Sequence, residues 1–306
     1  MAITVIGDST LDVTVRAAEA PRAGGDVPAS ISISPGGQGA NVAVRLARAR
    51  ADVRLATAVA DDAAGRMLAE ALEADGVAVV QLGAERSGLV ISLLDADGER
   101  AMLSDRVTLQ PTRLAEACAG ADWVHCSGYA LADDATGDAV AGILGSLPTT
   151  TPVSAGGGSL PDDPARSARV RARLATARVA LLVLSRDEAA ALLDRPLPSL
   201  AAAADAVAGA LPGLIAVVTG GAAGSSAAGP GFALSVPAVE QTTPMLDATG
   251  AGDAYLAALI LSLLEATWPP AVPNLREAME RAARHGALAS RVLGAQGRTA
   301  AESTTR

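Results

Sequence analysis

The segment that ends at Asp253 combines very small residues with a carboxylate, a pattern suited to holding an anion beside a base. Gly250, Ala251 and Gly252 have little or no side chain, so their backbone N–H groups can approach an anion closely. The apolar run Ala254 to Leu264 predicts a buried helix, which places these amides at a helix N-terminus, where negative charge is favoured. Asp253 is then placed to take a proton from a nucleophile while the amides hold a phosphate.

A second glycine-rich segment occupies residues 36–41 and reads Gly-Gly-Gln-Gly-Ala-Asn. Its glycines, Gly37 among them, allow the backbone to lie against a ligand, and the amides of Gln38 and Asn41 can donate to and accept from hydroxyl groups. Taken alone, the segment fits equally well a strand-to-helix turn with Asn41 as the N-cap.

Together, and in this order, the two segments resemble the two signatures of the ribokinase-like (PfkB) carbohydrate kinases. Residues 247–253 read Asp-Ala-Thr-Gly-Ala-Gly-Asp, and the resemblance extends over nearly the whole chain. It implies a doubly wound α/β sheet with a small β-sheet lid, and transfer of the γ-phosphate of ATP to a sugar or nucleoside hydroxyl. Carried over by position, it makes Asp253 the general base and the amides of Gly250, Ala251 and Gly252 the anion hole.

The same resemblance implies contacts for the acceptor, the nucleotide and metal ions. The residues on the acceptor side are Asp12, Gly37, Gln38 and Asn41. The residues on the ATP side are Thr219, Gly221, Gly224, Glu188 and His285. Glu188 is expected to reach Mg²⁺ through water, and Asp247 and Thr249 lie where the family binds an activating K⁺.

The chain also departs from the family pattern. Gln38 replaces the lysine of the ribokinases proper, which disfavours ribose, and Ser185 replaces the asparagine that precedes the family's glutamate. Residues 153–158 lack an aspartate that many members carry. Residues 291–297 form a segment about two residues shorter than in ribokinases, which leaves K⁺ activation open.

Several of these residues have a structural alternative. Asp12 could be an exposed charge on a lid strand. Glu188 could be a first-turn acid stabilised by the helix dipole. His285, alone on an alanine-rich helix, could be structural, and His125 is predicted to be a core residue of a strand.

Composition excludes other phosphate chemistries. All 24 basic residues are arginine, so a P-loop, a protein-kinase lysine and a Schiff base are impossible in this chain. The net charge of -9, the sequence pI near 4.8 and the presence of only five aromatic residues argue against nucleic acid as a partner. If the protein handles phosphate, it must use backbone amides, arginines and a metal.

Length and hydropathy place the chain among globular proteins. The 306 residues are half hydrophobic, which is enough to bury a large core, and no apolar run reaches the roughly eighteen residues of a membrane span. Two cysteines make no disulfide framework and indicate a reducing compartment, so we expect a cytoplasmic protein without a membrane partner.

The elements that must position these residues follow from alternating apolar runs and alanine-rich stretches, which predict a parallel sheet covered by helices on both faces. The predicted strands are residues 3–6, 53–58, 123–126, 179–184 and 214–219. The predicted helices are residues 41–49, 63–74, 112–117, 133–145, 186–193, 200–210 and 275–293. Residues 148–164 are expected to form a loop. We expect a single domain over 1–306, with lid strands within about 12–34 and 89–104 and a turn at 95–98.

The sequence therefore predicts an ATP- and Mg²⁺-dependent kinase for a sugar or sugar derivative. A nucleoside kinase of the same fold is one alternative, disfavoured because the lid strands carry no aromatic platform for a base. A non-catalytic homologue that binds a sugar or nucleotide is the other, disfavoured because a pure binder has no use for Asp253. A β lid exposes unpaired strand edges, which allows a homodimer.

Overall fold

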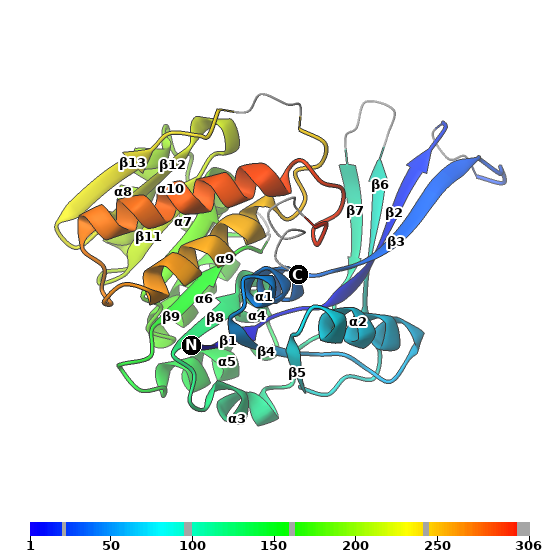
Figure 1. Cartoon of the computed structure of the whole chain (residues 1–306), viewed down its shortest axis with the longest axis horizontal. Coiled ribbons are helices and arrows are strands. Elements are labelled where there is room, and N and C mark those ends of the chain that lie inside the picture. The colour runs from blue at the N-terminus through cyan, green and yellow to red at the C-terminus, as the bar shows by residue number, and fades with distance from the viewer. Residues whose placement is uncertain (20–22, 95–99, 159–162, 241–244, 299–306) are drawn as a thin grey trace.

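The computed structural model describes residues 1–19, 23–94, 100–158, 163–240 and 245–298. Within these residues, the main sheet has nine strands in the order β13-β12-β11-β10-β9-β8-β1-β4-β5 (Figure 1). Its strands are β1 Ala2–Ile6, β4 Asp52–Thr57, β5 Ala78–Gln81, β8 Trp123–Ser127, β9 Val153–Gly156, β10 Leu181–Ser185, β11 Ile215–Thr219, β12 Ser225–Gly229 and β13 Phe232–Val236.

The sheet is parallel from β5 to β11, and β12 and β13 extend it as an antiparallel edge. Strand β1 lies between β4 and β8, and the chain then builds outward in both directions, as in a doubly wound sheet. This confirms the predicted fold class. In such sheets, ligands bind at the carboxyl ends of the strands near the point where the direction of winding reverses.

Helices cover both faces of the sheet and enclose two cores. Helices α1, α9 and α10 pack on one face, in front of the sheet in Figure 1, and α3 to α8 pack on the other. Helix α2 packs beside β5 and the lid. The helices are α1 Gln38–Arg48, α2 Ala63–Ala74, α3 Leu114–Cys118, α4 Gly128–Ala132, α5 Gly137–Gly145, α6 Pro164–Thr176, α7 Arg186–Leu193, α8 Leu200–Ala210, α9 Ala251–Leu264 and α10 Val272–Ala289. None of the helices in the described ranges is both long enough and apolar enough to cross a membrane.

The lid is a separate four-stranded sheet in the order β3-β2-β6-β7, which projects from the main body at the right of Figure 1. Its strands are β2 Thr10–Ala17, β3 Ala29–Gly36, β6 Gly88–Leu94 and β7 Arg100–Asp105. The predicted lid strands are therefore present, and β6 and β7 pair antiparallel as expected. The predicted turn at 95–98 lies outside the described residues.

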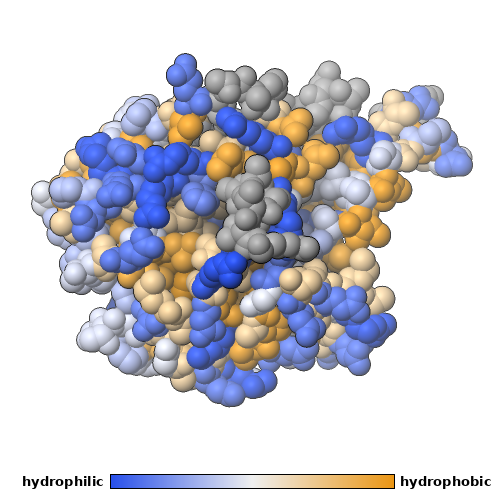
Figure 2. Space-filling view, in the orientation of Figure 1, coloured by the Kyte–Doolittle hydropathy of each residue, from blue (hydrophilic) through white to orange (hydrophobic). Residues whose placement is uncertain are grey.

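The two faces of the lid differ in polarity, because strand register places like residues side by side. Ile33, Val13, Ile91 and Leu103 form one row across the four strands, and Asp12 lies in the next row on the opposite face. Leu103 and Ile33 are 60% and 56% exposed, and apolar atoms are visible over the lid in Figure 2. The face that carries Asp12 is instead rich in serine.

Several elements differ from the sequence prediction. Residues 148–164 were expected to form a loop but contain β9, whose four residues are too few to show a period. Helix α6 was not predicted because arginine and alanine alternate in it without a clear apolar stripe. The expected helix over 133–145 begins at Gly137, since Asp133 caps the preceding turn by accepting from the N–H of Thr136.

Candidate active site

Asp253 lies in the first turn of α9, whose N-cap is Gly250 with φ 77°. This left-handed backbone favours glycine, and a side chain there would clash with the carbonyl oxygen of Ala295 at 2.6 Å. The apolar residues that follow are buried against α1 and α10, which anchors the helix start in the core. The half-buried Asp253 carboxylate accepts a hydrogen bond from Asn41 Nδ2 at 2.7 Å.

The surroundings of Asp253 tune its acidity. Burial is the largest effect and raises the pKa of Asp253 to about 7, although the hydrogen bond from Asn41 works in the opposite direction. The negative charges of Asp8 and Glu188 raise this pKa further, and the Arg45 guanidinium lowers it. A carboxyl group that titrates near neutrality can exchange protons readily at physiological pH.

The first-turn amides of α9 lie next to this carboxylate. The N–H of Ala251 donates to the carbonyl of Ala248 at 3.2 Å, which closes a tight turn. For the N–H groups of Gly250 and Gly252, no acceptor is found among the described residues. Free first-turn amides at a helix N-terminus form a general anion-binding arrangement.

The other glycine-rich segment reaches the same place from α1. Gly37, with φ 93°, is the residue before this helix, so Asn41 is not the N-cap but lies inside the first turn. Asn41 contacts Asp253 through Nδ2, and its Oδ1 accepts from Gln296 Nε2 at 3.1 Å. Gln38 and Asn41 are both buried. The fold thus brings together two segments more than 200 residues apart in the chain.

Asp12 approaches this segment from the lid. It lies on β2 opposite Ser34 of β3, and its carboxylate accepts from Thr10 Oγ1 at 2.7 Å. The side chain covers Gly36, where any side chain would collide with the carboxylate. Asp12 is half-buried and so differs from the fully exposed lid charge considered as an alternative.

Three of the predicted nucleotide residues lie where β11 ends and the chain turns toward β12. Thr219 ends β11, and Gly221 and Gly224 belong to the tight turn that leads into β12. Tyr255 Oη donates to Ser225 Oγ at 3.1 Å, which ties this turn to the first turns of α9. The role of Thr219, Gly221 and Gly224 in nucleotide binding stays a prediction.

Glu188 and His285 have different surroundings. Glu188 forms a capping box with Ser185: its Oε2 accepts from the N–H of Ser185 at 2.7 Å, and its own N–H donates to Ser185 Oγ at 3.1 Å. Burial raises the pKa of Glu188. His285 is exposed on α10, one residue before Gly286, which packs against Ala251 of α9.

Asp247 and Thr249 form a hydrogen-bonded turn. Asp247 Oδ1 accepts from the N–H of Thr249 and Oδ2 from the N–H of Gly294, both at 2.9 Å. The carbonyl of the nearby Ala295 accepts from Arg45 at 2.9 Å. Both Asp247 carboxylate oxygens and the Ala295 carbonyl thus each already accept a hydrogen bond from the protein.

Two charged residues at the site were missed by the sequence analysis. Asp8 follows β1 and forms an ion pair with Arg106, which follows the last lid strand. The Arg106 guanidinium also lies 3.7 Å from the centre of the Tyr129 ring. Neither belongs to a glycine-rich motif, so only their position after a strand end could have singled them out. The pair connects the lid to the main sheet.

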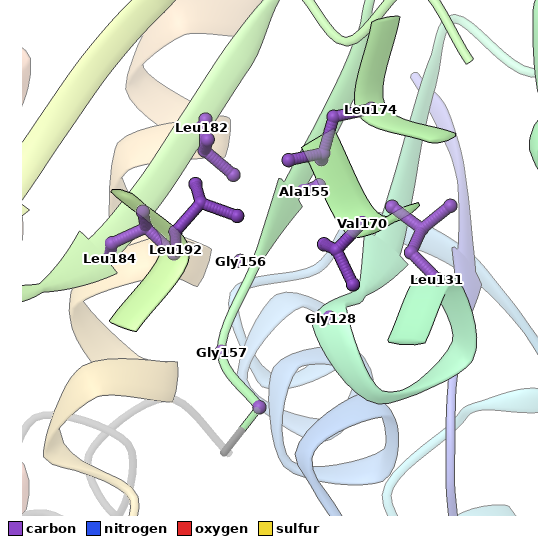
Figure 3. A pocket seen from close by; sticks show the side chains of 11 residues that line it. Gly128, Leu131, Ala155, Gly156, Gly157, Val170, Leu174, Leu182, Leu184 and Leu192 are labelled. Atoms are coloured by element: carbon purple, nitrogen blue, oxygen red, sulfur yellow. The ribbon is translucent and has the colours of Figure 1, made fainter. Parts of the chain in front are cut away.

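A separate pocket lies on the other side of β9, between β10 and helices α6 and α7 (Figure 3). No charged side chain is found among its lining residues, so it does not suit a phosphate. Gly157 borders both this pocket and the side chain of Gln38. The lining residues are Gly128, Leu131, Ala155, Gly156, Gly157, Gly158, Val170, Leu174, Leu182, Leu184 and Leu192.

A nine-stranded doubly wound sheet with a β lid is the ribokinase-like α/β fold, and comparison with known proteins agrees. Ribokinase from Giardia lamblia superposes with a TM-score of 0.81 at 15% identity, covering 98% of this chain and 96% of that one. A sugar kinase from Pyrococcus horikoshii in complex with ATP superposes with a TM-score of 0.77 at 20% identity, covering 99% and 96%. These likenesses establish the fold.

The sequence comparisons establish the family. The model of the pfkB family carbohydrate kinases matches residues 2–302. A fructokinase from Klebsiella pneumoniae is 29% identical over 309 residues, covering 96% of this chain and 94% of the relative. The chain belongs to the pfkB family of carbohydrate kinases.

Proposed function

We propose that this protein transfers the γ-phosphate of ATP to a hydroxyl group of a sugar, with Asp253 as the general base. The observation that carries the proposal is the Asp253 carboxyl, which has a pKa of about 7 and lies beside the N–H groups of Gly250 and Gly252, for which the described residues offer no acceptor. A carboxylate with such a pKa can accept the hydroxyl proton, and the adjacent amides suit the charge of the phosphoryl group.

The proposed step balances without a covalent intermediate. Asp253 removes the hydroxyl proton as the acceptor oxygen bonds to the γ-phosphorus, and the bond from that phosphorus to the β,γ-bridging oxygen breaks to release ADP. Asn41 holds the carboxylate in place, and the amides of Gly250, Ala251 and Gly252 stabilise the transferred group. Ala251 would have to exchange its contact with Ala248 to contribute fully.

On the acceptor side we propose Asp12, Gly37, Gln38 and Asn41 as contacts, and we take a ketohexose as the first candidate. The fructokinase relative supports this choice, as does Gln38 in place of the ribokinase lysine. A panel of pentoses, hexoses, sugar phosphates and nucleosides, assayed for ADP release, tests it. If only nucleosides are phosphorylated, the proposed acceptor is a nucleoside rather than a sugar. If ATP binds but no acceptor is phosphorylated, the protein is a non-catalytic homologue.

For the nucleotide we propose that Thr219, Gly221, Gly224 and His285 contact ATP. Complexes of relatives with ATP and ADP support this assignment. Within the described ranges, no three His, Cys, Asp or Glu side chains gather to hold a metal by themselves. Mg²⁺ would thus be held mainly by phosphate oxygens, with Glu188 contributing through water, and would neutralise charge on the phosphates.

We further propose that catalysis does not require K⁺. The Asp247 carboxylate and the Ala295 carbonyl already accept hydrogen bonds from the protein, and Arg45 supplies a fixed positive charge at this turn. We expect equal rates in potassium chloride and in tetramethylammonium chloride at the same ionic strength, because tetramethylammonium is too large for a carbonyl cage. A rate that falls several-fold without K⁺ would contradict this.

We also propose a homodimer through the lid. The lid presents an exposed apolar face, made by the Ile33 to Leu103 row and its neighbours, and its outer strands β3 and β7 have unpaired edges. A second copy of the lid would cover this face and leave the polar face, which carries Asp12, turned toward the site.

A further inference from the structure

A buried chain of polar side chains runs from the middle of the main sheet to Gln38. Trp123 Nε1 lies 2.8 Å from Ser154 Oγ, and Ser154 Oγ lies 3.0 Å from His125 Nδ1. On the other side of the imidazole ring, His125 Nε2 lies 3.4 Å from the amide of Gln38. His125 and Ser154 are completely buried, and Trp123 and Gln38 are nearly so.

The direction of this chain is set at Trp123, because an indole N–H can only donate. Ser154 Oγ must therefore accept from Trp123. Among the described residues, the only other partner of Ser154 Oγ is His125 Nδ1, so the serine proton finds an acceptor only on that nitrogen. A neutral imidazole whose Nδ1 accepts carries its proton on Nε2. Burial keeps the ring neutral, since it lowers the pKa of His125 to about 3.

The Gln38 amide must adapt to this direction. With its nitrogen beside His125 Nε2, two nitrogens face each other, and Gln38 Oε1 is buried without a hydrogen-bond partner in the described part of the chain. Rotating the Gln38 amide by half a turn exchanges its oxygen and nitrogen. The oxygen then lies next to the Nε2–H of His125, and the nitrogen occupies the position where Oε1 has no partner among the described residues. Nitrogen and oxygen are nearly equal in size, so the half-turn disturbs no packing.

Among the described residues, no hydrogen-bond partner is found for the amide atom of Gln38 that points away from His125. The surrounding fold also leaves the Gln38 side chain little room to move. Gly157, with φ 71°, packs against the side chain, and a Cβ at this residue would lie 2.8 Å from Gln38 Cγ. Gln38 also begins α1, one turn before Asn41, which holds Asp253. Because none of the described residues fills this position, we assign it to a ligand or water on the acceptor side of the site.

We propose that His125 is a positioning residue, which orients the Gln38 amide so that its N–H groups donate to an oxygen atom of the bound acceptor. The acceptor class is a sugar that offers a hydroxyl, ring, carbonyl or carboxylate oxygen at this point, and the identification of this ligand as a sugar rests on the proposed kinase function. From the sequence alone, His125 is predicted only to be a core residue.

The tautomer of His125 tests the proposal directly. The chain has two histidines, so ¹⁵N-histidine labelling gives two ring systems, and a His285→Gln variant assigns them. We expect His125 to be neutral with its proton on Nε2 from pH 5 to 9. A proton on Nδ1, or a ring that titrates near pH 6.5, would overturn the proposal. This measurement needs no turnover, so it is independent of whether the protein phosphorylates sugars.

A second experiment tests the link to the acceptor. Ser154→Ala removes the donor to Nδ1, so we expect a mixture of His125 tautomers. We also expect a rise of about fivefold in the KM for D-fructose, from the loss of one oriented hydrogen bond, with an unchanged KM for ATP. Cys126→Ala is the matched control, because it truncates a buried residue of β8, next to His125 but outside the chain of contacts. An altered tautomer with an unchanged KM for D-fructose would reject the positioning role.

Discussion

As the proposed general base, Asp253 would combine two opposing properties: it must ionise to accept a proton, and its buried surroundings disfavour that charge. We expect Asp253→Asn to lower kcat by roughly 100-fold or more, because a general base typically contributes that much, while the affinity for ATP is retained. The measurements are steady-state kinetics and ATP titration calorimetry. Near-normal turnover in this variant would end the assignment of Asp253.

The same substitution has a predicted effect on stability. Because the pKa of Asp253 is raised to about 7 in the folded protein, the folded state binds the proton more tightly than the unfolded state. This carboxyl therefore stabilises the fold below its unfolded pKa, and that contribution is lost as the pH rises to 7. At pH 8 we expect Asp253→Asn to have a higher free energy of unfolding than the parent protein, by an amount on the order of 3 kcal/mol. At pH 4 we expect no such difference.

Asn41 is expected to set the pH range of activity. Its hydrogen bond to Asp253 favours the ionised carboxylate, so Asn41→Ala should raise the pKa of Asp253 and move the acid limb of the kcat profile to higher pH, by roughly one unit. Asn274→Ala, an exposed asparagine of α10, is the control. If both variants keep the parental pH dependence of kcat, Asn41 does not shift the pKa of Asp253.

At the scale of the secondary-structure element, two variants at the start of α7 can separate the capping role of Glu188 from its proposed role toward Mg²⁺. Ser185→Ala removes half of the capping box and should lower the free energy of unfolding by about 1 kcal/mol without changing the Mg²⁺ requirement. Glu188→Gln keeps an oxygen that can accept from the N–H of Ser185, so it should preserve stability but raise the Mg²⁺ concentration needed for half-maximal rate. Denaturant titration and Mg²⁺ titration of the rate compare the two. If Glu188→Gln has an unchanged Mg²⁺ requirement, Glu188 acts only as a helix-capping residue.

Helix α9 could be predicted from the sequence, whereas β9 and α6 could not. Its apolar run is long and uninterrupted, so a buried helix preceded by small residues could be expected from the sequence. Short strands such as β9, and α6 with its many arginines, have no comparable pattern and form because neighbouring elements bury them.

At the scale of the whole molecule, the proposed dimer depends on the lid. Its exposed apolar face predicts a dimer in solution, and Ile33→Asp should convert the dimer to a monomer by placing a charge on that face. Light scattering after size exclusion measures the mass. Val272→Asp, an exposed apolar residue at the start of α10, should leave the mass unchanged. A monomeric parent protein would refute the dimer.

The fold class and the identity of the two glycine-rich segments could be predicted from the sequence alone, because both rest on local patterns. The absence of lysine likewise excluded other phosphate chemistries without any structure. Gly250, Gly37 and their neighbours could be recognised because glycine has conformational properties that no other residue shares.

The tertiary structure alone decided which groups meet. Asn41 reaches Asp253 across 212 positions of sequence, and Asp8 and Arg106 join the lid to the sheet, although neither contact has a local signature. The role of His125 as a partner of Gln38 also depends on a neighbour distant in the chain. The physical reason is that hydrogen bonds and burial act over a few ångströms in space, and only the packed sheet determines which residues lie that close.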